Sequence, residues 1–348
     1  MIVPLDDKRL KFSGRIDWTN AKKPEFVFPA TSLHFRFYGK KAVLTVGNRG
    51  GSGWRYYAGM VVDGEQSCRE LFYQGRTRVV LVDEPEEKEH DVLFFKRMDS
   101  CHEMILEELE LSPGSRLLEP PGRQKRRLEF YGDSVSAGEV SEAVGYAGKE
   151  DPEHKGEFTN SWYSFAWMTA RKLKAEIHDV AQGGIALLDY TGWFREPNQT
   201  GMESVWDKIH YNPDISAPTQ WDFSKYVPQA VVVALGQNDS HPLNYMKEDY
   251  EGEKAALWRK RYEEFLKKIR GKYPRAHIVC CTTILIHDLA WDKAIDEVCR
   301  RMGDDRVTHY MFRRNGTGTP GHPRITEADE MAGELADYLD SLHIEGWD

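Results

Sequence analysis

The chain has 348 residues, a length that exceeds one ordinary domain and suits two. Its formal net charge is −9 and its pI is near 5.8, so neither nucleic acid nor an anionic membrane surface would attract it. Hydrophobic residues make up 40% and charged residues 30%, as in soluble globular proteins rather than disordered ones. No apolar run approaches the ~20 residues that span a bilayer.

The cysteines bear on whether the protein holds a metal or disulfides, and the N-terminus bears on its cellular compartment. Five cysteines without a CxxC spacing argue against both a disulfide framework and a zinc site. We expect neither a metal nor another cofactor. The first eight residues lack the basic start and apolar core of a signal peptide. We therefore expect a cytoplasmic protein, or a secreted one if a leader has been removed.

Residues 1 to about 118 show the pattern of an all-β domain. Short strand-like runs recur at spacings of ~8–12 residues, with Gly, Asp and Pro turns between them. The runs cover residues 33–38, 42–46, 54–62, 68–73, 77–82, 90–95 and 104–111. Nothing in this half resembles a helix of three or more turns. The spacing predicts a β-sandwich.

The segment 118–123 is rich in proline and glycine and is the best candidate for a domain boundary. After it, strand-like runs alternate with helical ones, and residues 258–269 place apolar side chains on one helix face. This alternation predicts a mostly parallel, doubly wound sheet. We predict a β-sandwich domain over residues 1–120 and an α/β/α domain over residues 121–348. The strand-like runs of the second domain cover residues 128–131, 175–180, 230–235, 277–282 and 307–310.

Four short segments carry residue types that ester chemistry needs. Each follows a strand or precedes the last helix, so all four can meet at the carboxyl-terminal edge of a parallel sheet. Taken alone, each one is a weak signal, and Gly132-Asp133-Ser134 by itself is more typical of an ordinary turn. They are Gly132-Asp133-Ser134, the run Asp179 to Ile185 with Gly183-Gly184, Gly236-Gln237-Asn238-Asp239, and Thr319-Pro320-Gly321-His322-Pro323.

The chemistry explains why these residue types matter. A serine hydroxyl such as that of Ser134 is a poor nucleophile at neutral pH and needs an adjacent base. Histidine suits that task because its unperturbed pKa is about 6.5. His322 is one candidate, and His241, which also precedes a proline, is its rival. A tetrahedral intermediate needs preplaced donors, which the Asn238 amide and a closely approaching backbone at Gly184 can supply.

In order and spacing, the four segments resemble the SGNH (GDSL-type) hydrolases, whose blocks are Gly-Asp-Ser, a later Gly, Gly-x-Asn-Asp and a late His-Pro. The match covers roughly residues 127–343. The resemblance implies that Ser134 is the nucleophile and that His322, in the loop before the last helix, is its base. It also implies an oxyanion hole made by the backbone N–H groups of Ser134 and Gly184 and the side-chain amide of Asn238.

An all-β domain placed before a Gly-Asp-Ser domain is similar to carbohydrate esterase family 2, and the segment 221–226 before the third strand adds to the likeness. The resemblance implies a jelly-roll N-terminal domain and removal of O-acetyl groups from xylan, mannan or glucan units, often at the primary 6-hydroxyl. Without a leader, imported acetylated oligosaccharides are the expected substrate. The sandwich could instead be a carbohydrate-binding module, and the sequence leaves the oligomeric state open.

One position departs from the SGNH pattern. Most of these enzymes have Asp three residues before the histidine, where this chain has Thr319. Some members of the resembled family manage with Ser, His and a backbone carbonyl. We therefore predict a Ser134–His322 dyad without a carboxylate partner, with Thr319 as a candidate for orienting the histidine.

Aromatic residues near these segments are candidates for a sugar-binding surface, because an aromatic face buries the apolar side of a pyranose ring. Ordinary core packing explains them equally well. Two other functions remain open: a carbohydrate-binding protein on an inactive hydrolase scaffold, and a lipase-type esterase. The joint presence of a serine, an asparagine and a histidine argues against the first. The lack of an amphipathic surface helix near the site argues against the second. The aromatic candidates are Trp193, Phe194, Trp206 and Tyr211.

Overall fold

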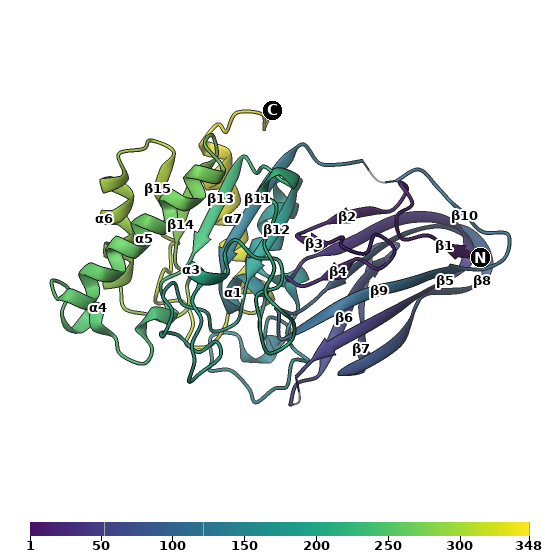
Figure 1. Cartoon of the computed structure of the whole chain (residues 1–348), viewed down its shortest axis with the longest axis horizontal. Helices are drawn as coiled ribbons and strands as arrows, with labels where there is room; N and C mark the ends of the chain where they lie inside the picture. Colours follow the sequence, from purple (N-terminus) through teal and green to yellow (C-terminus); the bar gives the residue numbers. More distant parts are fainter. Residues whose placement is uncertain (52, 121, 348) are drawn as a thin grey trace.

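The computed structural model describes residues 1–51, 53–120 and 122–347. They form an N-terminal β domain and a C-terminal α/β domain, which lie side by side in Figure 1, as the sequence pattern predicted. Pro121, at the expected boundary, lies outside the described residues. None of the helices in the described part of the chain combines the length and hydrophobicity that a bilayer span requires.

The β domain is a ten-stranded antiparallel sheet with the order β3-β4-β9-β5-β8-β6-β7, to which β1, β2 and β10 add at β9 and β5. Its long strands β5 (Ser32–Gly50) and β8 (Gln74–Lys96) pair along most of their length. The first half of β5 also pairs with β2 and β10, whereas its second half pairs with β9. The sheet is therefore folded over along these two strands (Figure 1). The other strands are β1 (Ile2–Val3), β2 (Lys11–Ser13), β3 (Ile16–Asp17), β4 (Glu25–Phe26), β6 (Tyr56–Val62), β7 (Glu65–Leu71), β9 (His102–Leu111) and β10 (Arg116–Leu117).

The strand count of this domain differs from the prediction. The runs 33–38 and 42–46 belong to the single strand β5, and the runs 77–82 and 90–95 belong to β8. The ladder between β5 and β8 shifts register near Gly39 and again after Ala42. Such bulges bend a strand without ending it, and in a sequence they look like a turn. Strands β1 to β4 have only two or three residues, too few to show an alternating pattern.

The α/β domain has five parallel strands in the order β12-β11-β13-β14-β15, matching the predicted runs. Neighbouring residues of β11 face opposite layers: Phe130 packs in the same apolar cluster as α2 and α7, and Tyr131 in that of α5 and α6. The strands are β11 (Arg126–Gly132), β12 (Ala175–Ala181), β13 (Ala230–Ala234), β14 (His277–Cys281) and β15 (Val307–His309). The helices are α1 (Ser134–Ala137), α2 (Phe165–Lys172), α3 (Met202–Val205), α4 (Tyr245–Glu248), α5 (Glu253–Lys272), α6 (Ala290–Met302) and α7 (Ile325–Ser341).

The strand order decides where a ligand can bind. The chain leaves β11 toward β12 on one side of the sheet and later returns to β13 on the other side. A crevice forms outside the carboxyl ends of the strands at such a switch point. The residues directly after β11, from Asp133 onward, lie at that crevice.

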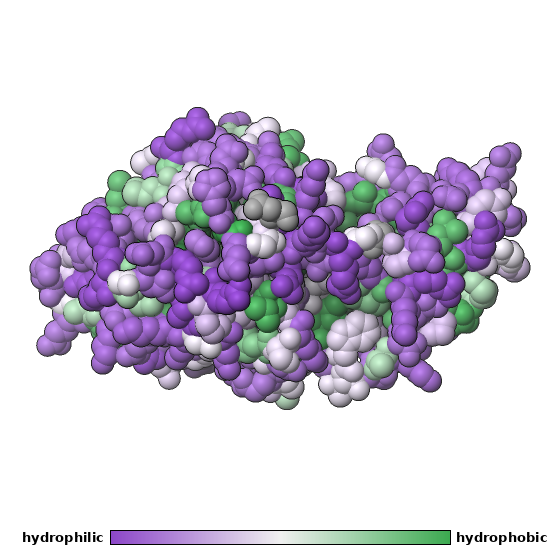
Figure 2. All heavy atoms as spheres, turned by 90° about the horizontal axis from the view of Figure 1, so that it is seen from above, coloured by the Kyte–Doolittle hydropathy of each residue, from purple (hydrophilic) through white to green (hydrophobic). Residues whose placement is uncertain are grey.

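Buried contacts join the two domains. Arg15 of the β domain lies 3.0 Å from Glu129 of β11, and both side chains are fully buried. The segment after β8 is held as well, because the Ser100 carbonyl accepts a hydrogen bond from Asn212 at 2.9 Å. Breaking a buried ion pair typically costs ~3–5 kcal/mol, so these contacts resist separation of the domains. From above, the joined surface is mostly hydrophilic, with apolar side chains in small separate groups (Figure 2).

Candidate active site

Strand β11 delivers Ser134 to the rim of the parallel sheet. Asp133 caps the short helix α1 by accepting a hydrogen bond from the Val135 N–H at 3.0 Å. Gly132 precedes this turn, and a Cβ there would lie 2.1 Å from Ser136 Oγ. The Ser134 hydroxyl makes no hydrogen bond to any described residue, and Ser134 lines a cleft of about 650 Å³. The local sequence thus leaves a serine hydroxyl free to react at the crevice.

The same cleft receives the other predicted residues. Gly184, Asn238 and His322 line it together with Ser134. His241, the rival histidine, lies under the Trp193 ring at 3.3 Å between ring centroids and is not among the residues that line this cleft. The four segments that the sequence singled out therefore meet, and of the two histidines it is His322 that faces the serine's cleft.

His322 has a carboxylate partner. Its Nδ1 lies 2.6 Å from Asp151 Oδ2, and its backbone N–H donates to Asp151 Oδ1 at 2.9 Å. Arg324, fully buried, lies 2.8 Å from the same carboxylate. The prediction of a dyad without a carboxylate is therefore wrong in geometry. Asp151 lies 171 positions before the histidine, in a charged exposed loop, so no spacing rule marks it.

These contacts set the charge states of the pair. Burial alone would lower the pKa of His322, but the hydrogen bond to Asp151 and the nearby carboxylates of Glu139 and Asp133 raise it overall. Burial raises the pKa of Asp151, yet the His322 and Arg324 contacts hold it well below its usual range. Asp151 is thus a carboxylate at neutral pH and favours the imidazole tautomer with hydrogen on Nδ1, which leaves Nε2 free to accept a proton.

Thr319 does not orient the histidine. Its side chain is 1% exposed, and its hydroxyl has no hydrogen-bond partner in the described part of the chain. Its backbone instead bridges to the β14–α6 connection, accepting from the Ile286 N–H at 2.9 Å. The place that a carboxylate three residues before the histidine would fill is taken by Asp151 from another loop.

Two backbone donors face the cleft beside the serine. Neither the Ser134 N–H nor the Gly184 N–H donates a hydrogen bond to any described residue. Gly184 has a φ of +70°, and a Cβ there would lie 2.8 Å from the Trp193 Cβ, so the turn requires glycine. The Asn238 amide donates to the Ile185 carbonyl at 3.0 Å and more distantly to Asp133 at 3.3 Å. Free backbone N–H groups on two residues that line one cleft suit an anionic oxygen.

The β domain holds this turn in place. Asp99, in the loop between β8 and β9, accepts hydrogen bonds from the Gly183 N–H at 2.7 Å and the Gln182 side chain at 2.8 Å. A Cβ on Gly183 would lie 2.7 Å from the Asp99 carboxylate. No local sequence pattern indicates this contact, because it joins the two domains. Asp99 is a positioning residue for Gly184.

Replacing Asp99 with alanine should lower kcat by about 10-fold with little change in KM, because a hydrogen bond to a charged group contributes about 1.5–3 kcal/mol to holding the turn. Steady-state kinetics on an acetyl ester, with the thermal midpoint as a check on folding, would measure it. A raised KM at constant kcat would show instead that Asp99 contacts the substrate.

The aromatic candidates divide into exposed and buried ones. Trp193 is 56% exposed and lines the cleft, and Phe194 also lines it. Trp206 and Tyr211 are only 6% and 2% exposed, Trp206 packing against Phe265 of α5 and Tyr211 against Phe28, so their predicted role in sugar binding is wrong. Trp54 of the β domain, 41% exposed and also lining the cleft, is an aromatic that the sequence reasoning missed.

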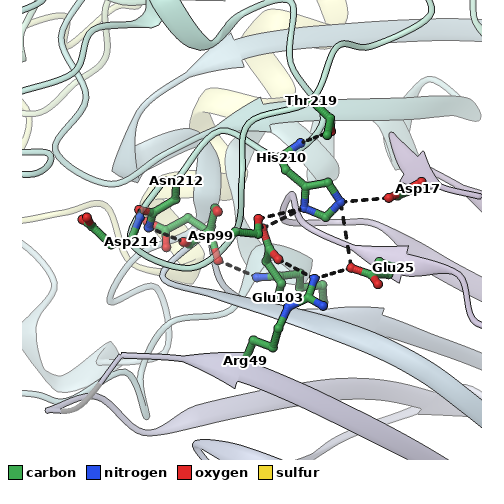
Figure 3. Close-up of polar contacts among 12 residues, drawn as sticks. Asp17, Glu25, Arg49, Asp99, Glu103, His210, Asn212, Asp214 and Thr219 are labelled. Carbon is green, nitrogen blue, oxygen red and sulfur yellow. Dashed lines mark hydrogen bonds and ion pairs between the residues drawn. The ribbon is translucent and has the colours of Figure 1, made fainter. Parts of the chain in front are cut away.

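A cluster of charged side chains lies at the domain interface, next to the cleft (Figure 3). Asp17, Glu25 and His210 bring potential metal-ligating atoms within 4.8 Å of one another. Both nitrogens of His210 are already hydrogen-bonded, Nδ1 to Glu103 at 2.9 Å and Nε2 to Asp17 at 3.0 Å. The guanidinium of Arg49 also binds Glu25 and Glu103. With two cationic side chains among the carboxylates, the cluster is an ion-pair network that fastens the loop after α3 to the β domain.

Known proteins are similar to this chain in its β domain and over its full length. A family model described as the carbohydrate esterase 2 N-terminal domain matches residues 12–121. Cellulase/esterase CelE of Acetivibrio thermocellus is 29% identical over 345 residues, covering 95% of this chain. The chain is thus similar to carbohydrate esterase family 2. It spans 39% of the length of CelE.

A solved structure and a second sequence relative show the same similarity over both domains. A family two carbohydrate esterase from Clostridium thermocellum, solved in complex with cellohexaose, matches with a TM-score of 0.81 and 26% identity over 97% of this chain and all of that one. The acetylxylan esterase / glucomannan deacetylase of Cellvibrio japonicus is 22% identical over 342 residues, covering 97% of this chain and 90% of that protein. The β domain and the SGNH-type parallel sheet are thus shared with this family.

Proposed function

We propose that the protein is a serine esterase that removes O-acetyl groups from acetylated xylo-, manno- or gluco-oligosaccharides. The observation that carries the proposal is the His322–Asp151 contact in the cleft that Ser134 lines. Relatives named as acetylxylan esterase and glucomannan deacetylase support the substrate class. A structure solved with cellohexaose supports an oligosaccharide rather than a simple ester.

The proposed reaction follows the serine hydrolase scheme. Ser134 Oγ attacks the acetyl carbonyl while His322 Nε2 takes its proton, and Asp151 stabilises the resulting imidazolium. The N–H groups of Ser134 and Gly184 stabilise the tetrahedral oxyanion together with one amide hydrogen of Asn238, which exchanges its long 3.3 Å contact to Asp133 for the oxyanion. His322 then returns the proton to the sugar oxygen, which leaves an acetyl-serine. A water molecule, deprotonated by the same histidine, releases acetate.

The shape of the cleft supports a sugar substrate. Its walls come from both domains, with the exposed Trp54 from the β domain and the exposed Trp193 from the α/β domain. The buried face of the Trp193 ring is occupied by His241, which leaves its other face for a ligand. Exposed aromatic faces beside polar side chains suit a pyranose ring, which has one apolar side.

The test is acetate release from a small acetyl ester, followed by a panel of acetylated xylo-, manno- and gluco-oligosaccharides read by mass spectrometry. The proposal expects turnover of at least one series. Sugar binding without acetate release from the wild-type protein would favour a carbohydrate-binding protein on an inactive scaffold. A preference for long-chain acyl esters would favour the lipase-type alternative.

Replacing Asn238 with alanine should reduce kcat by ~10²–10³ with little change in KM, since its amide is proposed to act mainly in the transition state. Initial rates over a range of acetylated oligosaccharide concentrations would separate the two constants. If KM rises while kcat holds, Asn238 binds the ground-state substrate and the proposed oxyanion hole needs another donor.

A further inference from the structure

Glu139 has a place in the cleft that the proposed mechanism does not use. It follows the serine by five residues, and its N–H donates to the Ser134 carbonyl at 2.9 Å, so its position relative to the nucleophile is fixed. Glu139 lines the same cleft. One carboxylate oxygen lies 4.0 Å from His322 Nε2, and the other lies 4.0 Å from His154 Nε2.

This carboxylate lacks a partner within the protein. No described residue forms a hydrogen bond with it, and both histidine contacts exceed hydrogen-bond distance. The nearest surrounding groups include the carboxylates of Asp99 and Asp151, which repel it. Together with burial, they raise the pKa of Glu139, whereas His322 lowers it. Only 23% of the side chain is exposed, so water reaches this unpaired carboxylate only in part and a ligand hydroxyl in the cleft can satisfy it.

The distance between the Glu139 carboxylate and His322 indicates which part of a bound substrate the carboxylate can contact. In the proposed reaction, Nε2 of His322 hands its proton to the leaving oxygen of the sugar. Because the Glu139 carboxylate lies 4.0 Å from that nitrogen, it is within reach of a group attached next to the leaving oxygen. In a sugar, the carbon next to the ester-bearing carbon usually carries a hydroxyl, which is a hydrogen-bond donor. A carboxylate is a strong acceptor for such a donor.

We propose, on the basis of the proposed function, that Glu139 is a specificity-determining residue that accepts a hydrogen bond from a free hydroxyl adjacent to the acetylated one. The substrate class is thus a partly acetylated polyol whose neighbouring hydroxyl is unmodified. Gly183 makes room for this contact, since a Cβ there would lie 2.9 Å from the Glu139 carboxylate. The pairing selects sugar monoesters over alkyl esters at the leaving-group side of the cleft.

Two small esters isolate this contact. 2-Hydroxyethyl acetate and propyl acetate have similar sizes and differ by a hydroxyl in place of a methyl group. The wild-type protein should prefer the hydroxyl ester in kcat/KM. Glu139→Ala should reduce that preference by about 10- to 100-fold, the range for a lost hydrogen bond to a charged group. Glu139→Gln keeps a carbonyl acceptor and the side-chain shape, so its preference for the hydroxyl ester should lie between those of the wild type and Glu139→Ala.

Within one variant, the ratio of kcat/KM for the two esters is unaffected by a change in the His322 pKa, because such a change alters both rates equally. Glu153→Gln is the matched control, because Glu153 is exposed, two residues from Asp151, and outside the cleft lining. Its ratio should equal that of the wild type, and an equal fall there would reassign the effect to general charge and overturn the proposal. An unchanged ratio in Glu139→Ala, with both esters still cleaved, overturns the role of Glu139 alone. Failure of the wild type to cleave any acetyl ester or acetylated oligosaccharide overturns the esterase function, and this role with it.

Discussion

Replacing Ser134 with alanine should lower acetate release by at least ~10³ while leaving the fold intact. The change removes the covalent step, because alanine has no nucleophilic atom. The hydroxyl makes no hydrogen bond to any described residue, and Asp133, not Ser134, caps helix α1. The free energy of unfolding should therefore change little. Turnover of an acetylated oligosaccharide, with circular dichroism of the same samples, provides the measurement.

The control for Ser134 is chemical labelling. A serine-directed phosphonate or sulfonyl fluoride should modify Ser134 in the wild-type protein, and peptide mass spectrometry would locate the adduct. Ser136, two residues away and fully buried, should stay unlabelled. Retention of more than about a tenth of wild-type turnover by Ser134→Ala would exclude Ser134 as the nucleophile.

The α/β domain was more predictable from sequence than the β domain, for a physical reason. Strands β11 and β13 are covered on both faces, so β13 appears as a short continuous apolar run and β11 as an apolar run interrupted only by the buried Glu129 after its two arginines. Strand β5 instead runs for 19 residues through a bulge near Gly39. Its two halves face different neighbours, so the local pattern resembles two strands with a turn.

The candidate site divides in a similar way. Ser134, Gly184 and Asn238 follow strands that end at one edge of a parallel sheet, so local sequence and topology together place them in one cleft. Asp151 and Asp99 reach that cleft from loops that carry no periodic pattern. Their contacts depend on how separate parts of the chain pack, which a single sequence does not encode locally. The chemical roles of all these residues remain predictions.

Residue type alone did not distinguish buried aromatic side chains from exposed ones. Trp206 follows α3 and packs against Phe265 of α5, with ring centroids 6.1 Å apart. Trp193 lies thirteen residues earlier and is mostly exposed. Both occur in the long connection between β12 and β13, and residue type alone does not tell which face of that connection is covered by α5.

Replacing Asp151 with asparagine should lower kcat by ~10²–10⁴, the second largest effect expected here. An asparagine amide can donate to His322 Nδ1, which moves the ring hydrogen to Nε2 and removes the base. A reversed tautomer of this kind costs ~10⁴ in a serine protease. Thr319→Ala is the control and should lower kcat by less than ~10-fold, because the Thr319 hydroxyl has no partner in the described part of the chain.

The pH dependence separates this role from a loss of structure. Only neutral His322 can act as base, so kcat/KM should rise with pH through the raised pKa of His322. The Asp151 carboxylate is one cause of that raised pKa, so in Asp151→Asn the residual activity should rise at lower pH than in the wild type. Loss of the Arg324 partner will also destabilise the fold, and a thermal midpoint on the same variant measures that cost independently. A loss below ~10-fold with an unmoved pH limb would mean that a backbone carbonyl suffices, and would restore the dyad as the better description.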